Sequence, residues 1–171
     1  LHRSARGRAL GPAGARDVAR ALPEEVPVAI TVNGTTQAVM MASPADIEDF
    51  ATGFAVSEGM VTTPAQIERV EVLDLPDGIE ARLWLPDDLA EALGARRRAM
   101  MGPVGCGLCG IESLEQAVRP VPPVPEGPRL TLAEVAGAAE ALRAHQPLHD
   151  RTRAVHAAGF YQPGLGIVLA R

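Results

Sequence analysis

Residues 26–41 read V-P-V-A-I-T-V-N-G-T-T-Q-A-V-M-M. Every second residue in the first half of this segment is apolar: Val26, Val28, Ile30 and Val32. Such alternation is typical of a strand with one buried face. Asn33-Gly34 then supplies the positive φ angles of a tight turn, and the chain returns in an extended form over residues 35–41. The segment therefore predicts a β-hairpin, and with it a fold built on a sheet.

A helix is expected directly after this hairpin. Ser43 offers a hydroxyl cap, Pro44 suits a first helical turn, and Asp46 lies near the positive end of the dipole. Apolar residues then recur at helical spacing: Ile47, Phe50, Ala51, Phe54 and Ala55. The pattern predicts a helix that runs to about Glu58 and stops at Gly59. We also expect four large side chains in the core: Met40, Met41, Phe50 and Phe54.

Further strands and helices follow this first helix. Residues 67–75 and 79–85 are predicted strands, because they flank the turn sequence Pro76-Asp77-Gly78. Residues 87–97 and 111–118 are predicted to be short helices. A proline-dense connector then covers residues 119–128 and marks the clearest internal boundary.

The segment after the connector opens with a capping box. Thr131 is followed three residues later by Glu134, which predicts a helix that runs to about His145. Residues 154–161 and 165–169 are predicted strands on either side of a Pro-Gly turn. Hairpins come first along the chain, and strands and helices alternate later. This order predicts a mixed α/β domain, with a mixed sheet and flanking helices.

Four regions are expected along the chain. Residues 1–24 are predicted to be a disordered leader, because this arginine-rich segment lacks periodicity. Residues 25–118 form an N-terminal subdomain, residues 119–128 the connector, and residues 129–171 the start of a C-terminal part. The chain begins with Leu and ends in the apolar run G-I-V-L-A-R, so we expect that the fold continues beyond it.

Composition and charge argue against two classes of partner. The 171 residues are 47% hydrophobic and 22% charged, which suits an ordinary folded domain. No apolar run approaches the roughly 18 residues that a membrane helix requires. The net charge of -5 provides no global positive field for a phosphate backbone. We therefore expect neither a membrane nor a nucleic acid as the partner.

The clearest chemistry lies at residues 102–110, which read G-P-V-G-C-G-L-C-G. Cys106 and Cys109 are separated by two residues and surrounded by glycines, which leave space beside sulfur and let the backbone adapt. A cysteine just before a helix also feels the positive end of the dipole, which favours the reactive thiolate. The pattern favours a loop that handles sulfur.

Other interpretations of the cysteine pair stay open at this point. A zinc site would need further ligands, which His145, His149 and His156 could offer, and such a site would make the chain a non-catalytic binding module. The linker to His145 is about three times longer than the ~12–15 residues of a zinc finger, and Pro147 interrupts any helix with both nearer histidines. A thioredoxin-like centre would need a strand that leads directly into the motif. Two structural cysteines are the remaining alternative.

A resemblance to a known family adds to these observations. The run C-G-L-C-G is similar to the signature of the FdhD family, the accessory sulfurtransferases of formate dehydrogenase. The patterns at residues 25–34 and 43–59 resemble the N-terminal part of that family in the same order. Residues 152–158, T-R-A-V-H-A-A, resemble its T-G-G-x-H-A-A segment, with Arg153 and Ala154 in place of glycines.

This resemblance implies a cytoplasmic sulfur carrier with a fold like that of cytidine deaminases. A cysteine desulfurase would load a persulfide on Cys106, with Cys109 either resolving or redundant. The sulfur would pass to the molybdenum guanine dinucleotide cofactor for formate dehydrogenase, and the carrier would work as a homodimer without a permanent metal. The residues implied at the cofactor are Gly105, Gly107, Gly110 and His156. Taken alone, a histidine within an apolar run is more often an interior residue than a ligand.

Overall fold

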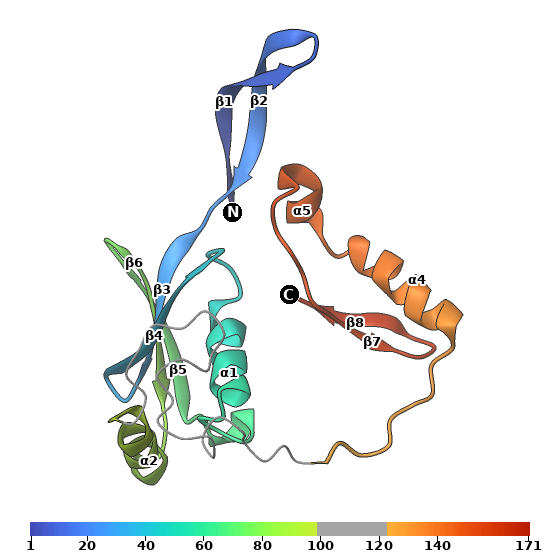
Figure 1. Cartoon of the computed structure of the whole chain (residues 1–171). Coiled ribbons are helices and arrows are strands. Elements are labelled where there is room, and N and C mark those ends of the chain that lie inside the picture. The colour runs from blue at the N-terminus through green and yellow to red at the C-terminus, as the bar shows by residue number, and fades with distance from the viewer. Residues whose placement is uncertain (99–122) are drawn as a thin grey trace. The chain divides into compact units, whose positions relative to one another are not determined.

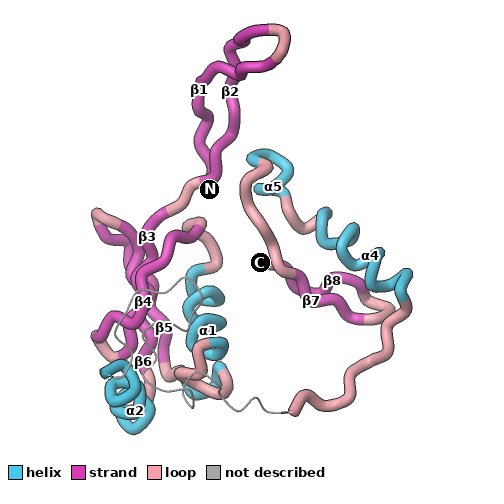
Figure 2. Tube along the Cα trace, in the orientation of Figure 1, coloured by secondary structure: helices cyan, strands magenta, loops and turns pink. Residues whose placement is uncertain are grey.

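The computed structural model describes residues 1–98 and 123–171, which belong to two compact units. The sheet unit comprises Pro27–Met41 and Ile47–Pro125, and the second unit comprises Leu1–Val26, Ala42–Asp46 and Glu126–Arg171. Both units combine helices with strands (Figure 2). The last boundary between them, after Pro125, lies inside the proline-dense connector, where residues 123–130 form neither helix nor strand.

A four-stranded sheet forms the centre of the sheet unit, in the order β4-β3-β6-β5 (Figure 1). Its strands are β3 (Val26–Val32), β4 (Thr35–Ala42), β5 (Arg69–Leu75) and β6 (Gly78–Trp84). β3 pairs with β6 in parallel, whereas β5 pairs with β6 in antiparallel fashion. Asn33 and Gly34 have φ angles of 44° and 78° at the turn between β3 and β4. The predicted hairpin at residues 26–41, the two predicted strands around Pro76-Asp77-Gly78 and the mixed sheet are confirmed.

The apolar core lies between this sheet and α1 (Ile47–Ser57), which packs against β5 and β6. The buried apolar side chains are Val28, Ile30, Val32, Ile47, Ala51, Ala55, Val61, Ile79, Ala81, Leu83 and Leu85. Those on the strands follow a period of two, and those on α1 recur every four residues, as the sequence pattern predicts. Phe50 and Phe54 are only half-buried. Met41 is 60% exposed, so its prediction as a core residue is wrong.

The start of α1 also differs from the prediction. Asp46 has a φ angle of 51°, which interrupts helical geometry, so Ser43 and Pro44 form a separate turn before the helix. The predicted end is confirmed by a Schellman arrangement around Gly59, whose φ angle is 67°. Its N–H donates to Val56 O at 3.0 Å, and Met60 N donates to Ala55 O at 2.8 Å.

A short 3-10 helix, η1 (Pro64–Gln66), leads into β5, and α2 (Asp87–Arg98) follows β6. The predicted helix over residues 87–97 is therefore confirmed to within one residue. None of the helices in the described part of the chain is long and apolar enough to span a bilayer.

The N-terminal segment is a hairpin of β1 (His2–Gly11) and β2 (Gly14–Pro23), with ten residue pairs in its ladder. The prediction of a disordered leader over residues 1–24 is therefore wrong. Gly14, with a φ angle of 97°, helps to close the turn, and Glu24 N donates to Leu1 O at 3.0 Å beyond the ladder. Most side chains are exposed on both faces of this ribbon, so its sequence lacks the alternation that marks a strand.

The C-terminal part of the second unit contains α4 (Leu132–Arg143), α5 (Pro147–Thr152), β7 (Gly159–Gln162) and β8 (Gly166–Ala170). The capping box is confirmed: Glu134 N donates to Thr131 Oγ1 at 3.2 Å, and Thr131 N donates to Glu134 Oε2 at 2.8 Å. The sequence pattern did not indicate α5, which begins at Pro147. Residues 154–158 form a loop instead of the first half of the predicted strand.

Candidate functional site

The predicted sulfur-handling segment falls outside the described residues. This applies to both cysteines and to three predicted cofactor contacts: Cys106, Cys109, Gly105, Gly107 and Gly110. The predicted helix over residues 111–118 lies there as well. The structure does describe the element that leads into this segment, α2, and the loop that carries His156.

The chain enters α2 from a strand end that Asn33 holds in place. The Asn33 side chain accepts a hydrogen bond from Leu85 N and donates one to Leu85 O, both at 2.9 Å. Asn33 N also donates to Leu83 O at 3.0 Å. One asparagine at the β3–β4 turn therefore binds the last part of β6 through its backbone and the residue after β6 through its side chain. These bonds hold Leu85, two residues before the start of α2, beside the β3–β4 turn.

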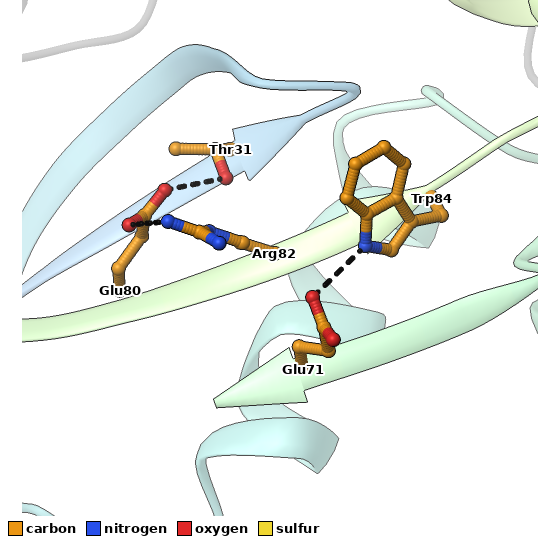
Figure 3. Close-up of polar contacts among 5 residues, drawn as sticks. All are labelled: Thr31, Glu71, Glu80, Arg82 and Trp84. Carbon is orange, nitrogen blue, oxygen red and sulfur yellow. Dashed lines mark hydrogen bonds and ion pairs between the residues drawn. The ribbon is translucent and has the colours of Figure 1, made fainter. Parts of the chain in front are cut away.

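Polar side chains lie on the face of the sheet opposite the apolar core, because successive residues of a strand point to opposite faces (Figure 3). The carboxylate of Glu80 accepts hydrogen bonds from Thr31 Oγ1 at 3.2 Å and from Arg82 Nη2 at 2.9 Å. Beside this cluster, Trp84 Nε1 donates to Glu71 Oε2 at 3.2 Å. The guanidinium of Arg69 lies 5.1 Å from the centroid of the Trp84 ring. These contacts join β3, β5 and β6.

The charges of this cluster are stabilised in their ionised forms. The hydrogen bond from Arg82 is the main reason that the pKa of Glu80 lies below its ordinary value of 4.5, and Thr31 adds to the effect. Glu80 in turn raises the pKa of Arg82. A carboxylate held in this way is a poor general base near neutral pH. These contacts therefore favour the charged forms of Glu80 and Arg82 and connect β6 to β3 through Thr31.

The loop that carries His156 is anchored at both ends. At its start, Arg153 has a left-handed φ angle of 57°, and its N–H donates to His149 O at 2.7 Å. At its end, Ala158 N donates to Arg171 O at 2.8 Å and Arg171 N donates to Ala158 O at 3.0 Å. The ring nitrogen Nδ1 of His149 lies 2.6 Å from Val155 O, in the middle of the loop. The backbone around His156 is thus held at three points.

Asp150 supports the start of this loop electrostatically. Its Oδ1 lies 3.6 Å from Arg143 Nη2 and 3.5 Å from Arg153 Nη1. These groups are about half-exposed, so each ion pair contributes modestly. Together they connect the end of α4 to α5 and to the first residue of the loop.

His156 is exposed in this arrangement. It is therefore not the interior histidine that its apolar surroundings in the sequence would suggest. An exposed imidazole on an anchored backbone is available to a ligand or to a partner.

A family model described as FdhD/NarQ matches residues 23–171. The chain belongs to the FdhD/NarQ family. The match includes the C-G-L-C-G run and the T-R-A-V-H-A-A segment, so the resemblance noted in the sequence is confirmed. Most of the N-terminal hairpin precedes the matched residues.

Several members of the FdhD family are closely similar to this chain. The sulfur carrier protein FdhD of Agrobacterium fabrum is 50% identical over 153 residues, which are 89% of this chain and 56% of that protein. The protein of the same name from Brucella abortus is 50% identical over 159 residues, or 92% of this chain and 59% of that protein. The chain therefore spans little more than half the length of these two relatives.

A solved structure supports the fold of this FdhD-family chain. A crystal structure from Desulfotalea psychrophila, described as that of a formate dehydrogenase accessory protein, superposes with a TM-score of 0.64. The similarity covers 99% of this chain and 60% of that one, at 20% sequence identity. The predicted mixed α/β class is thus confirmed.

The zinc alternative gains no support from the described part of this FdhD-family chain. No group of three His, Cys, Asp or Glu side chains there could hold a metal ion. His145 is exposed, and the Nδ1 atom of His149 already faces a carbonyl oxygen. A complete site would require the cysteine pair, which lies outside the described residues.

Two sets of contacts were not predicted from the sequence. The first is the cluster around Glu80, although the alternation of residues 79–84, I-E-A-R-L-W, places Glu80 and Arg82 on one face. The second is the contact of His149 with the loop of His156. Arg153 has a left-handed conformation between them. An arginine by itself does not indicate that conformation, but the family segment that it resembles has a glycine at this position.

Proposed function

We propose that this chain is part of a sulfur carrier that takes persulfide sulfur from a cysteine desulfurase. The carrier then delivers this sulfur to the molybdenum guanine dinucleotide cofactor needed for formate dehydrogenase activity. The observation that carries the proposal is the shared name of two relatives, both sulfur carrier proteins FdhD and both 50% identical to this chain. The identity extends over 89% and 92% of the chain and the family match includes the C-G-L-C-G run.

The loading step is a thiol exchange at sulfur. The thiolate of Cys106 attacks the terminal sulfur of the desulfurase persulfide and forms a new S–S bond. The original S–S bond breaks, and the desulfurase cysteine leaves as a thiolate. One S–S bond replaces another, so the step requires no external oxidant or reductant. Gly105 and Gly107 leave space beside Cys106 for the approaching partner protein.

Delivery of the sulfur as sulfide requires an electron pair, which Cys109 can supply. Its thiolate attacks the Sγ atom of Cys106, expels hydrosulfide toward the acceptor and closes a disulfide between the two cysteines. A cellular dithiol then reduces this disulfide and restores the carrier. The cofactor is the acceptor in this scheme, with Gly105, Gly107, Gly110 and His156 as its contacts. The scheme makes the carrier a sulfurtransferase.

The physiological setting completes the proposal. The protein would act in the cytoplasm as a homodimer, with a cysteine desulfurase and a formate dehydrogenase as its partners. The formate dehydrogenase partner is supported by the Desulfotalea psychrophila protein, which is described as a formate dehydrogenase accessory protein.

Complementation tests this function in cells. A bacterium that lacks its own sulfur carrier should regain formate dehydrogenase activity when it receives the full-length protein, but not the Cys106→Ala variant. Cys109→Ala should retain part of the activity if Cys109 is redundant, and none if it resolves the persulfide. Full rescue by Cys106→Ala, at equal protein levels, would overturn the assignment of Cys106.

A further inference from the structure

We infer that His149 is the positioning residue for His156, and that it acts on the delivery of sulfur but not on its loading. The inference rests on the proposed function, because it assigns His156 to the acceptor side of the reaction. The contact of His149 with the loop backbone is independent of that function.

The tautomer of His149 follows from its partner. Val155 O is a carbonyl oxygen and can only accept a hydrogen bond, so the Nδ1 atom at 2.6 Å must carry the proton. The residue at position 149 thus donates to a loop residue six positions further along the chain. Both partners are half-buried, which limits the competition from water.

This one bond orients the backbone of His156. The carbonyl group of Val155 and the N–H group of His156 belong to the same planar peptide unit. When His149 holds the oxygen, it also fixes the plane of the unit and the position of the His156 Cα atom. The ring of His156 stays exposed, while the direction in which it leaves the backbone is set.

The loop ends alone would not produce this effect. Arg153 and Ala158 anchor the two ends, and four residues lie between them. The contact to Val155 O is the bond that reaches the middle of this span. An acceptor that meets His156 therefore does not have to order the loop first, which lowers the cost of binding. Loading on Cys106 occurs with another partner protein and does not involve this loop in the proposed scheme.

Two substitutions of His149 distinguish the effect of its hydrogen bond from the effect of its side-chain volume. His149→Asn keeps an N–H donor near the position of Nδ1, whereas His149→Leu fills the space without a donor. His145→Leu is the matched control, because His145 is an exposed histidine just before α5.

Nuclear magnetic resonance on the full-length protein tests the structural half of the inference. The wild-type spectrum should show a protonated Nδ1 atom on His149. Backbone order parameters at residues 155–157 should be about 0.85 in the wild type and in His149→Asn, and below about 0.6 in His149→Leu. A protonated Nε2 with a bare Nδ1, or a loop that stays rigid in His149→Leu, would overturn the positioning role.

A two-step sulfur assay tests the functional half. His149→Leu should load persulfide to the wild-type extent but deliver it about five-fold more slowly, the factor that corresponds to one ordinary hydrogen bond. His149→Asn and His145→Leu should deliver at close to the wild-type rate. Equal delivery rates for His149→Leu and the wild type, or equal losses for His149→Leu and His149→Asn, would contradict the inference. A wild-type protein that accepts no sulfur would instead refute the proposed function, and the order parameters would still decide the positioning claim.

Discussion

The carboxylate of Glu80 connects two strands that lie far apart in the sequence. It accepts a hydrogen bond from Thr31 on β3 and another from Arg82 on its own strand, β6. Both bonds favour the ionised carboxylate, and the Arg82 bond has the largest effect on the pKa of Glu80. The stabilisation that Glu80 gives to the parallel pairing of β3 with β6 therefore depends on pH.

The sign of this dependence follows from the lowered pKa of Glu80. In the unfolded chain the carboxyl binds a proton near pH 4.5, whereas in the folded protein it does so only at lower pH. The stabilisation is thus complete above pH 4.5 and is lost as the pH falls through the folded-state value. We predict that the unfolding free energy of Glu80→Gln falls less steeply with decreasing pH in this range than that of the wild type.

Urea denaturation at a series of pH values measures this difference. Glu126→Gln serves as the control, because it removes an exposed carboxylate from the connector. Its pH profile should run parallel to that of the wild type. A Glu80→Gln profile that also runs parallel would mean that the cluster does not stabilise the folded state through its charge.

At the scale of elements, the turn into β6 depends on a glycine. Gly78 has a φ angle of 152°, and a Cβ atom there would collide with the carbonyl oxygen of Pro27. The collision involves backbone, which cannot move without a shift of β3 against β6. We predict that Gly78→Ala lowers the unfolding free energy by about 2 kcal/mol or more.

The matched substitution is Gly53→Ala in the exposed part of α1. In the part of the chain that the structure describes, no atom beyond the adjacent backbone of α1 lies within 4 Å of the Cβ position at Gly53, so alanine gains helix propensity there without a clash. This variant should be more stable by roughly 0.5–1 kcal/mol. Thermal or chemical denaturation of both variants checks the pair, and equal effects of the two substitutions would contradict the assigned role of Gly78.

The elements that the sequence predicts best are those with local signals. Asn33-Gly34, the capping box at Thr131 and the stop at Gly59 each depend on contacts within a few residues, and all three are confirmed. Local patterns do not reveal the left-handed Asp46, which shortens α1. They also do not reveal the N-terminal hairpin, because both faces of its ribbon are exposed.

At the scale of the whole molecule, the pairing of β3 with β6 could not be read from the sequence. The two strands lie about fifty residues apart, as the Thr31–Glu80 contact shows, and no local pattern encodes such a partner. The resulting core lies in the sheet unit: all eleven buried apolar residues found in the described part of the chain belong to it. The sheet unit thus holds this core together with α2, the described helix that precedes the cysteine pair in the sequence.

The sequence predicted the chemistry of the cysteine pair better than the surroundings of His156. The spacing and the glycines of the C-G-L-C-G run indicate sulfur chemistry, and the family match confirms the resemblance that this run suggested. The exposure of His156 required the structure, because an apolar run gives no indication of which residues face solvent. A fold like that of cytidine deaminases and the roles of the individual cysteines stay predictions.

The central claim is that Cys106 carries a persulfide, and intact mass measures this most directly. Three proteins would be incubated with a cysteine desulfurase and cysteine: the full-length wild type, Cys106→Ala and Cys109→Ala. The intact mass of each would then be measured under native and under denaturing conditions. The account predicts one added sulfur that a thiol reductant removes and that only Cys106→Ala fails to gain. A zinc ion in the native mass, released on denaturation and without any sulfur adduct in the wild type, would contradict the account.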